Sequence, residues 1–182
     1  MKARAKAVFI DRDGVLIRDA DYLADVAGLR VLKGAPQALK RLRKAGFKVV
    51  IVTNQSGVAR GYFTEAAVRR IHAELKRRLA RSGAKWDAVY FSPHGPKSGH
   101  PWRKPGTGML RAAQKRFGLD LKASYLIGDR TSDIECARRA GCAGVLVRTG
   151  KGGRDGDYKA KPSAIRRDLP AAARWIISQE NT

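Results

Sequence analysis

Two acidic residues stand close together where an apolar run of the chain ends. Asp11 and Asp13 follow the run VFI, and Gly14 comes next. If this run is a buried strand, the alternation of side chains along it directs both carboxylates to the same side. A buried carboxylate is costly unless it is paired or bound to a metal, whereas a turn with two solvated acids is the simplest alternative. The choice between them depends on what the rest of the chain brings to the same place.

Polar and charged residues also follow other apolar runs. Thr53 comes directly after KVVIV, Lys104 lies in the segment beyond AVYF, and Asp129 follows SYLIG, with Asp133 four positions later. If these runs are parallel strands, their carboxyl ends meet at one edge of a sheet, where such proteins bind ligands. An isolated Asp-Gly turn does not account for this convergence, so we interpret the acids as part of a site.

The residue types indicate phosphoryl chemistry. Clustered carboxylates repel one another, and a hard divalent cation relieves this repulsion. We expect Mg²⁺, which takes few carboxylates together with water and a substrate phosphate, and we expect Asp11, Asp13 and Asp129 to bind it. Lys104 and Thr53 would supply a positive charge and a hydroxyl donor to the phosphoryl group.

The two neighbouring acids are expected to divide the chemistry between them. Asp11, the first residue after the strand, is the predicted nucleophile that forms an aspartyl-phosphate. Asp13 is the predicted general acid and base, which protonates the leaving oxygen and later activates water.

The elements that must position these residues alternate along the chain. Short apolar runs rich in branched residues predict strands, and segments with apolar residues at helical spacing separate them. This alternation predicts an α/β fold, a doubly wound parallel sheet with helices on both faces. The predicted strands are 7–10, 48–53, 88–91, 124–128 and 144–147, and the predicted helices are 35–46, 64–83, 108–118, 132–141 and 169–177.

Length and composition limit the possible classes of protein. The 182 residues are expected to form a single domain, 1–182, and two cysteines are too few for a disulfide framework. We therefore expect a cytoplasmic protein, and we expect no association with membranes because no apolar segment is long enough to span one. The formal net charge of +22 favours anionic partners, but the basic residues are scattered over several helices. Nucleic-acid association stays open at this point, and we expect a monomer.

Five segments together resemble a known family. The segments DRDGV, VVIVTNQSGVARGYFTE, RKPGTGML, SYLIGDRTSD and VLVRTGK are similar to the histidinol-phosphatase-like branch of the haloacid dehalogenase superfamily, from residue 7 to about residue 178. The resemblance implies a Rossmann-like Mg²⁺-dependent phosphatase without a cap domain. It implies the same roles for Asp11 and Asp13, and a metal held by Asp11, the backbone carbonyl of Asp13 and Asp129. Thr53 and Lys104 would stabilise the phosphoryl group.

The resemblance also implies a substrate. It predicts removal of the 7-phosphate of a heptose 1,7-bisphosphate, in the synthesis of precursors for surface glycans. Hydrolysis of a 3′-phosphate on DNA ends and of histidinol phosphate are the alternatives, and a catalytically silent binding protein is a further one. Arg130 stands where the family normally has lysine, so the charge is kept but its geometry changes. The residues expected to contact the sugar or its second phosphate are Asp19, Ala20, Asp21, Tyr22, Asn54, Gln55, Ser56, Arg103 and Arg130.

One segment departs from the family pattern. The family binds structural zinc through Cys-x-His and a Cys-x-Cys just before Arg-Lys-Pro, whereas Ser92, His94, His100 and Trp102 occupy these places here. A structural zinc site needs four nitrogen or sulfur ligands, so we expect no zinc. We expect prolines and packing of Trp102 to order the loop instead.

Three further features are given no part in the site. His72 falls within a charged helix and is predicted to be solvated. Cys136 and Cys142 are predicted to be small buried side chains. The segment 151–162 is predicted to be a polar, mobile loop.

Overall fold

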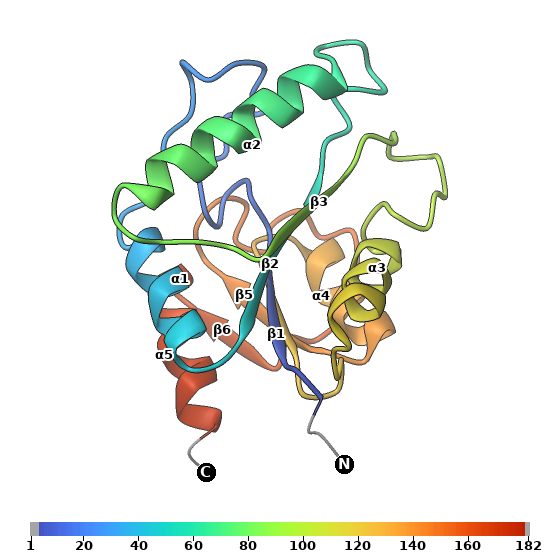
Figure 1. The fold of residues 1–182 in the computed structure, drawn as a ribbon. Coiled ribbons are helices and arrows are strands. Elements are labelled where there is room, and N and C mark those ends of the chain that lie inside the picture. Colours follow the sequence, from blue (N-terminus) through green and yellow to red (C-terminus); the bar gives the residue numbers. More distant parts are fainter. Residues whose placement is uncertain (1–3, 181–182) are drawn as a thin grey trace.

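The structure, a computed structural model, describes residues 4–180 and contains one six-stranded sheet (Figure 1). All neighbouring strands pair in parallel, in the order β3-β2-β1-β4-β5-β6. The predicted α/β fold with a parallel sheet is confirmed. The strands are β1 (Ala7–Ile10), β2 (Lys48–Asn54), β3 (Ala88–Ser92), β4 (Tyr125–Gly128), β5 (Ala143–Val147) and β6 (Ala164–Arg166).

Successive side chains of the central strands enter two different cores. In β1, Val8 and Ile10 pack into the larger core cluster, while Ala7 and Phe9 pack into the smaller one. All four side chains are fully buried. A strand covered on both faces reads as a continuous apolar run, which is why the sequence marks β1 so clearly.

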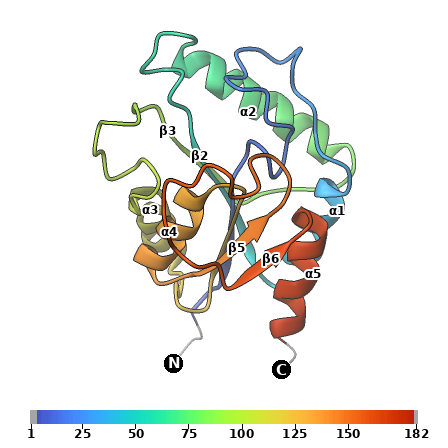
Figure 2. The same ribbon diagram turned by 180° about the vertical axis from the view of Figure 1, so that it is seen from behind.

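Helices cover both faces of the sheet (Figures 1 and 2). α1 (Ala35–Lys44), α2 (Glu65–Ala80) and α5 (Leu169–Gln179) contribute apolar residues to the larger core. α3 (Gly108–Phe117) and α4 (Thr131–Ala140) contribute to the smaller one. Among residues 4–180, no helix combines the length and apolar character needed to cross a membrane.

The buried face of α2 is wider than the sequence indicated. The helix begins after Thr64, whose side chain accepts a hydrogen bond from the Ala67 amide, as expected of an N-terminal cap. Its apolar stripe is buried as predicted, but His72 is buried as well, with 6% of its surface exposed. The prediction that His72 is solvated was therefore wrong, because His72 lies on the buried face of the helix together with Ile71 and Leu75.

The order of the strands creates a switch point beside β1. The chain runs outward from β1 through β2 to β3, then returns to β4 and runs the other way. Connections that diverge in this way leave a crevice at the carboxyl ends of β1 and β4. The Asp11 amide donates to the Ile127 carbonyl at 2.9 Å, so the residues that follow the two strands are held side by side.

The sixth strand was not predicted. β6 pairs with β5 at the edge of the sheet, and only its first residue, Ala164, is buried. A three-residue strand with one buried side chain leaves no alternating or continuous apolar pattern in the sequence.

Candidate active site

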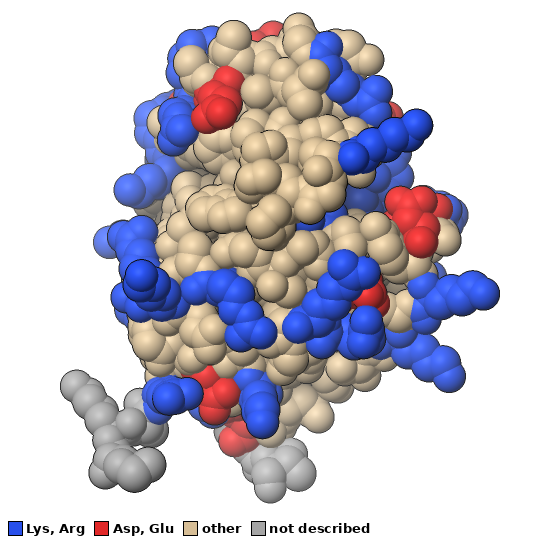
Figure 3. All heavy atoms as spheres, turned by 90° about the vertical axis from the view of Figure 1, so that its right-hand side faces the viewer, with Lys and Arg blue, Asp and Glu red and all other residues tan. Residues whose placement is uncertain are grey.

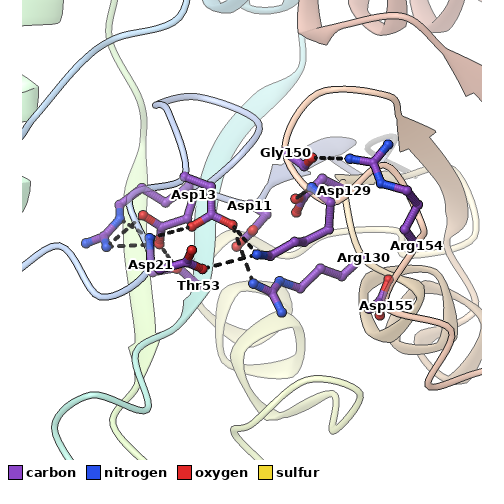
Figure 4. A network of polar contacts seen from close by, with 12 residues as sticks. Asp11, Asp13, Asp21, Thr53, Asp129, Arg130, Gly150, Arg154 and Asp155 are labelled. Atoms are coloured by element: carbon purple, nitrogen blue, oxygen red, sulfur yellow. Dashed lines mark hydrogen bonds and ion pairs between the residues drawn. The ribbon is translucent and has the colours of Figure 1, made fainter.

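Three carboxylates gather at the switch point. Oxygen atoms of Asp11, Asp129 and Asp133 all lie within 4.8 Å of one another, and all three residues are buried. Figure 4 shows Asp13 and Thr53 on one side of Asp11 and Asp129, which follows β4, on the other. Asp11 and Asp129 were expected here. The side chain of Asp133 belongs to this cluster, whereas the side chain of Asp13 lies outside it.

The electrostatics of the cluster favour a cation. Burial, with the charges of Asp133 and Asp13, raises the pKa of Asp11 to about 7 in spite of the opposing charge of Lys104. Burial, followed by the charges of Asp11 and Asp133, raises the pKa of Asp129 to about 8. Two carboxyl groups with raised pKa values resist being charged at the same time. Positive charge placed among Asp11, Asp129 and Asp133 would therefore stabilise all three carboxylates.

Lys104 supplies part of that charge. Its Nζ donates to Asp11 Oδ1 at 2.8 Å and to the Val52 carbonyl at 3.0 Å, and it lies 2.6 Å from Asp133 Oδ1. Burial alone would lower the pKa of Lys104, but Asp11 and Asp133 together raise it above its usual value. The lysine is therefore a permanent cation next to the predicted nucleophile.

Asn54 holds Lys104 in place. Its amide group accepts from the Lys104 backbone amide and donates to the Lys104 carbonyl, both at 3.0 Å. These two bonds join the end of β2 to the loop that carries the lysine. A contact of Asn54 with substrate stays a prediction.

Asp13 is held by residues of two segments. Arg12 Nε donates to its Oδ2 at 3.1 Å and Nη2 donates to its Oδ1 at 3.0 Å. Gln55 Nε2 donates to the same Oδ2 at 2.8 Å and to the Thr53 hydroxyl at 2.9 Å, while the Thr53 hydroxyl itself lies 3.4 Å from Oδ2. The sequence indicated no role for Arg12, because the other residues that contact its guanidinium, Gln55 and His72, lie far from it along the chain.

The segment after β5 closes over Asp129. The amide of Lys151 donates to Asp129 Oδ2 at 2.6 Å, and the amide of Gly153 donates to the Asp129 carbonyl at 2.7 Å. A Cβ at Gly150 would lie 2.1 Å from Asp129 Oδ2, and one at Gly14 would lie 2.4 Å from it. Both positions therefore require glycine. The sequence predicts only a polar loop over 151–162 and carries no sign of this contact.

The same segment is anchored to α4. Asp155 accepts from the backbone amide of Thr131 at 3.0 Å and from its hydroxyl at 2.6 Å. Hydrogen bonds of Lys151, Gly153 and Asp155 therefore tie the first residues of this segment to the site, while the mobility of 151–162 stays a prediction.

A cleft of about 600 Å³ opens over the acids. Among the residues that the structure describes, Ala20 is the one predicted substrate contact that does not line it. Arg60, Lys151 and Tyr158 also line the cleft and were not singled out from the sequence. The predicted contacts that line it are Asp19, Asp21, Tyr22, Asn54, Gln55, Ser56, Arg103 and Arg130.

Basic side chains face two acids at the edge of this cleft. Asp19 Oδ2 lies 3.5 Å from Arg130 Nη2 and 3.8 Å from Lys151 Nζ. Lys151 Nζ also donates to Asp21 Oδ1 at 3.1 Å. Arg130 and Lys151 come from different loops, so the edge of the cleft joins three segments through ion pairs.

The loop that departs from the family pattern is packed by aromatic rings. His94 and His100 stack with ring centroids 3.5 Å apart, and Trp102 packs edge-on against Tyr90 at 6.0 Å. Arg103 Nη1 donates to the His94 carbonyl at 2.9 Å, which links this loop to the cleft. Packing of Trp102 agrees with the expectation from sequence, while the absence of zinc stays a prediction.

The acid cluster fits a divalent cation. Asp129 Oδ1 is buried and has no hydrogen-bond partner among residues 4–180. An unpaired buried carboxylate oxygen is rare without a ligand. Together with the nearby oxygens of Asp11 and Asp133, it offers the hard oxygen donors that Mg²⁺ prefers.

A parallel sheet of this order, with oxygen ligands for a cation at its switch point, defines a Rossmann-like α/β protein that binds its ligand at the carboxyl ends of the strands. Residues 8–91 match the family model described as haloacid dehalogenase-like hydrolase, and residues 101–172 match a second one described as HAD-hydrolase-like. Sequence relatives cover nearly the whole chain. The chain belongs to the haloacid dehalogenase-like hydrolases.

Two of the similar proteins are named as heptose bisphosphate phosphatases. A D-glycero-D-manno-heptose-1,7-bisphosphate 7-phosphatase of Thermosynechococcus vestitus is 44% identical, over 94% of this chain and 95% of the relative. The D-glycero-beta-D-manno-heptose-1,7-bisphosphate 7-phosphatase of Escherichia coli K12 is 37% identical, over 98% of this chain and 91% of the relative.

A solved structure is also similar. The D,D-heptose 1,7-bisphosphate phosphatase of Bordetella bronchiseptica, solved with magnesium and phosphate, superposes with a TM-score of 0.87. It is 38% identical and the match covers 96% of this chain and 99% of that chain.

Proposed function

We propose that the protein is a Mg²⁺-dependent phosphatase that removes the 7-phosphate of a heptose 1,7-bisphosphate, in the synthesis of precursors for surface glycans. The observation that carries this proposal is the pairing of buried Asp11 with Lys104, whose Nζ lies 2.8 Å from Asp11 Oδ1, beneath a cleft lined with basic side chains. The relatives named above act on the same substrate class by name.

In the first step, a carboxylate oxygen of Asp11 forms a bond to phosphorus, and the bond between phosphorus and the C7 oxygen breaks. The leaving oxygen takes a proton from the carboxyl group of Asp13. The products are the heptose 1-phosphate and an aspartyl-phosphate on Asp11. Lys104 and the Thr53 hydroxyl stabilise the negative charge on the phosphoryl oxygens.

In the second step, water attacks phosphorus and the bond to Asp11 breaks. Asp13, now a carboxylate, takes the proton of the attacking water. Inorganic phosphate leaves, and Asp11 and Asp13 return to their starting states.

The enzyme uses Mg²⁺. Asp11, Asp129 and the backbone carbonyl of Asp13 are the ligands we propose, with Asp133 adjacent and paired with Lys104. When bound, the ion supplies positive charge that offsets the repulsion among the acids and between them and the phosphate.

Basic residues of the cleft support recognition of a second phosphate. Arg103, Arg130 and Lys151 line the cleft and would present positive charge to an anionic group of the substrate. The short polar side chains of Asp19 and Ser56 suit hydroxyl groups of a sugar. We propose that the remaining predicted contacts either bind the substrate directly or position the side chains that bind it. These residues are Asp21, Tyr22, Asn54 and Gln55.

The organisation of the chain is proposed on the same basis. A single domain without a cap, 1–182, is supported by the one sheet and by the cleft, which loops of this chain line. We propose a monomer. A cytoplasmic location is supported by the two cysteines, which are both free and buried.

The alternatives are separable by their substrates. Hydrolysis of histidinol phosphate or of a DNA 3′-phosphate would depend on the same carboxylates. Because the net charge of +22 favours anionic partners, DNA is the stronger alternative of the two. The test compares kcat/KM for a heptose 1,7-bisphosphate, histidinol phosphate and a 3′-phosphorylated oligonucleotide in one Mg²⁺-containing buffer. We expect the heptose to be preferred by orders of magnitude, and a preference for either other substrate would overturn the proposal.

A further inference from the structure

The side chain of Arg12 is completely enclosed although it carries a charge. It is 1% exposed, and it is among the largest fully buried side chains of residues 4–180. A buried guanidinium is expensive unless its N–H groups find acceptors. All three of its nitrogens have partners here, and each partner fixes one direction of the planar group.

The partners of Arg12 come from three segments. Nε and Nη2 bind the two carboxylate oxygens of Asp13, and Nη2 also donates to Gln55 Oε1 at 2.9 Å. Nη1 lies 3.2 Å from Nε2 of His72 on α2. Because burial and the charge of Arg12 lower the pKa of His72 to about 3, the imidazole is neutral and its Nε2 accepts this bond.

These contacts treat the two oxygens of Asp13 differently. Oδ2 accepts from Arg12 and from Gln55, and the Thr53 hydroxyl lies near it as well. Among the described residues, Oδ1 accepts a hydrogen bond from Arg12 alone. A carboxylate oxygen can accept two hydrogen bonds, so Oδ1 keeps a lone pair for a proton or a substrate oxygen.

We propose that Arg12, braced by His72 and Gln55, is a positioning residue that fixes Asp13 so that its Oδ1 exchanges the proton with the leaving oxygen. The inference rests on the proposed function, since it assumes that Asp13 is the acid of the first step. His72 acts from a distance: it does not line the cleft, but it sets the direction of the guanidinium that holds Asp13. Loss of these contacts to Arg12 would change the orientation of the Asp13 carboxyl group, while the side chains of Asp11, Lys104 and Asp129 would stay in place.

The leaving group gives the sharpest test. A sugar alkoxide is a poor leaving group and needs its proton, whereas the p-nitrophenolate of p-nitrophenyl phosphate leaves with little help from an acid. For both substrates kcat/KM reports the steps through formation of the aspartyl-phosphate. Poor positioning of Asp13 should therefore lower kcat/KM for the heptose bisphosphate much more than for the aryl phosphate.

Three variants and one control carry the experiment. His72→Leu keeps a side chain of similar volume and removes the acceptor of the Arg12 bond. Arg12→Lys keeps the positive charge but loses the planar group that binds both oxygens of Asp13. His72→Gln restores an acceptor oxygen. Leu75→Ala is the matched control, because Leu75 lies on the same buried face of α2, and its truncation lowers stability without removing a hydrogen-bond partner of Arg12.

We expect His72→Leu and Arg12→Lys to lower kcat/KM for the heptose bisphosphate by about ten-fold or more, and by a small factor for p-nitrophenyl phosphate. His72→Gln should recover most of the loss. Leu75→Ala should lower Tm and leave the ratio of the two kcat/KM values unchanged. Equal losses on both substrates, or a Leu75→Ala effect of the same pattern, would overturn the inference.

Asp13→Asn separates this inference from the proposed function. If Asp13→Asn is itself selective for the poor leaving group but the Arg12 and His72 variants are not, positioning by Arg12 is wrong and the role of Asp13 stands. If Asp13→Asn shows no selectivity, the assignment of Asp13 as the acid fails, and the inference fails with it. Should His72→Leu fail to fold, Arg12→Lys and His72→Gln still decide the outcome.

Discussion

At the scale of single residues, the site combines groups that would each be unstable in the interior alone. Asp11 is buried beside Asp133, yet the ammonium of Lys104 bridges the two at 2.8 and 2.6 Å. A carboxylate held in this way is partly neutralised before substrate arrives, which reduces its repulsion of an incoming phosphate. Its attack on phosphorus thus depends on charge, which an amide cannot replace.

Asp11→Asn should abolish phosphate release. The amide keeps the shape of the side chain but can neither attack phosphorus nor bind Mg²⁺ strongly. Phosphate release from the heptose bisphosphate measures this, with circular dichroism to confirm the fold. Asp25→Asn, at an exposed loop position whose side chain accepts from the Ala27 amide, is the matched control and should keep full activity. Wild-type turnover by Asp11→Asn would show that another group is the nucleophile.

His72 should make the protein sensitive to acid. Its pKa is lowered to about 3 by burial, by Arg12 and by Arg69, against the opposing charge of Asp13. In the unfolded chain its pKa is about 6.5, so below that pH the unfolded state takes up a proton that the folded state refuses. Stability contributed by the neutral imidazole is therefore present above about pH 6.5 and is lost as pH falls, by up to about 1.4 kcal/mol per pH unit.

The matching measurement is the free energy of unfolding in urea between pH 7 and pH 5. Wild type should lose more stability over this range than His72→Gln, which cannot take up the proton. Identical pH dependence of the two proteins would mean that His72 is protonated in the folded state.

At the scale of elements, the site depends on the close approach of two loops to the Asp129 carboxylate. Gly14 lies in the loop after β1 and Gly150 in the loop after β5, and they are so close that a Cβ at Gly150 would lie 2.7 Å from the Cα of Gly14. Both glycines have positive φ, 80° and 60°. The chain can therefore close over Asp129 only where side chains are absent.

Gly150→Ala should damage the metal site more than the fold. Its Cβ would meet Asp129 Oδ2 at 2.1 Å, so the carboxylate or the loop must move. Gly156→Ala is the matched control, since Gly156 has a similar φ of 65° and a Cβ there would meet nothing within 4 Å. Both variants should lose about 1 kcal/mol from the backbone alone.

The two glycine variants should then differ in Mg²⁺ dependence. Gly150→Ala should need more Mg²⁺ for half-maximal activity and should show a lower kcat, while Gly156→Ala should match wild type in both. The readout is activity across a Mg²⁺ titration, with Tm measured for each protein. Equal Mg²⁺ dependence in the two variants would show that the loop after β5 does not constrain Asp129.

The same elements explain what the sequence could and could not predict. Asp11, Thr53 and Asp129 were placed correctly at one edge of the sheet because each lies at the end of a buried strand, and strand ends converge by topology. Arg12 was missed because its importance lies in partners that are far away along the chain, on α2 and just after β2. The contact of Lys151 with Asp129 was missed for a similar reason, since a polar loop carries no periodic signal.

At the scale of the whole molecule, positive charge is spread rather than concentrated. Figure 3 shows one face with Lys and Arg projecting from many points and acidic side chains at a few. Some of the charge is locally balanced on the helices. Glu74 pairs with Arg77 and Arg78 on α2, and Glu135 pairs with Arg138 and Arg139 on α4. On the face shown, the basic side chains stand at separate points and do not form a single track.

This distribution predicts DNA binding without DNA processing. Duplex DNA should bind through phosphate contacts alone, with a Kd that rises steeply as salt is added and with no preference for sequence or for 3′-phosphorylated ends. Such binding occupies outer faces of helices, so saturating duplex should leave kcat/KM for the heptose bisphosphate unchanged at low salt. Fluorescence anisotropy over a salt series, with turnover measured in the same samples, tests both points.

Arg103→Ala, which removes a cation from the cleft, should weaken sugar turnover and leave the anisotropy unchanged. Competitive inhibition by the duplex, together with loss of DNA binding in Arg103→Ala, would instead place nucleic acid in the cleft over Asp11.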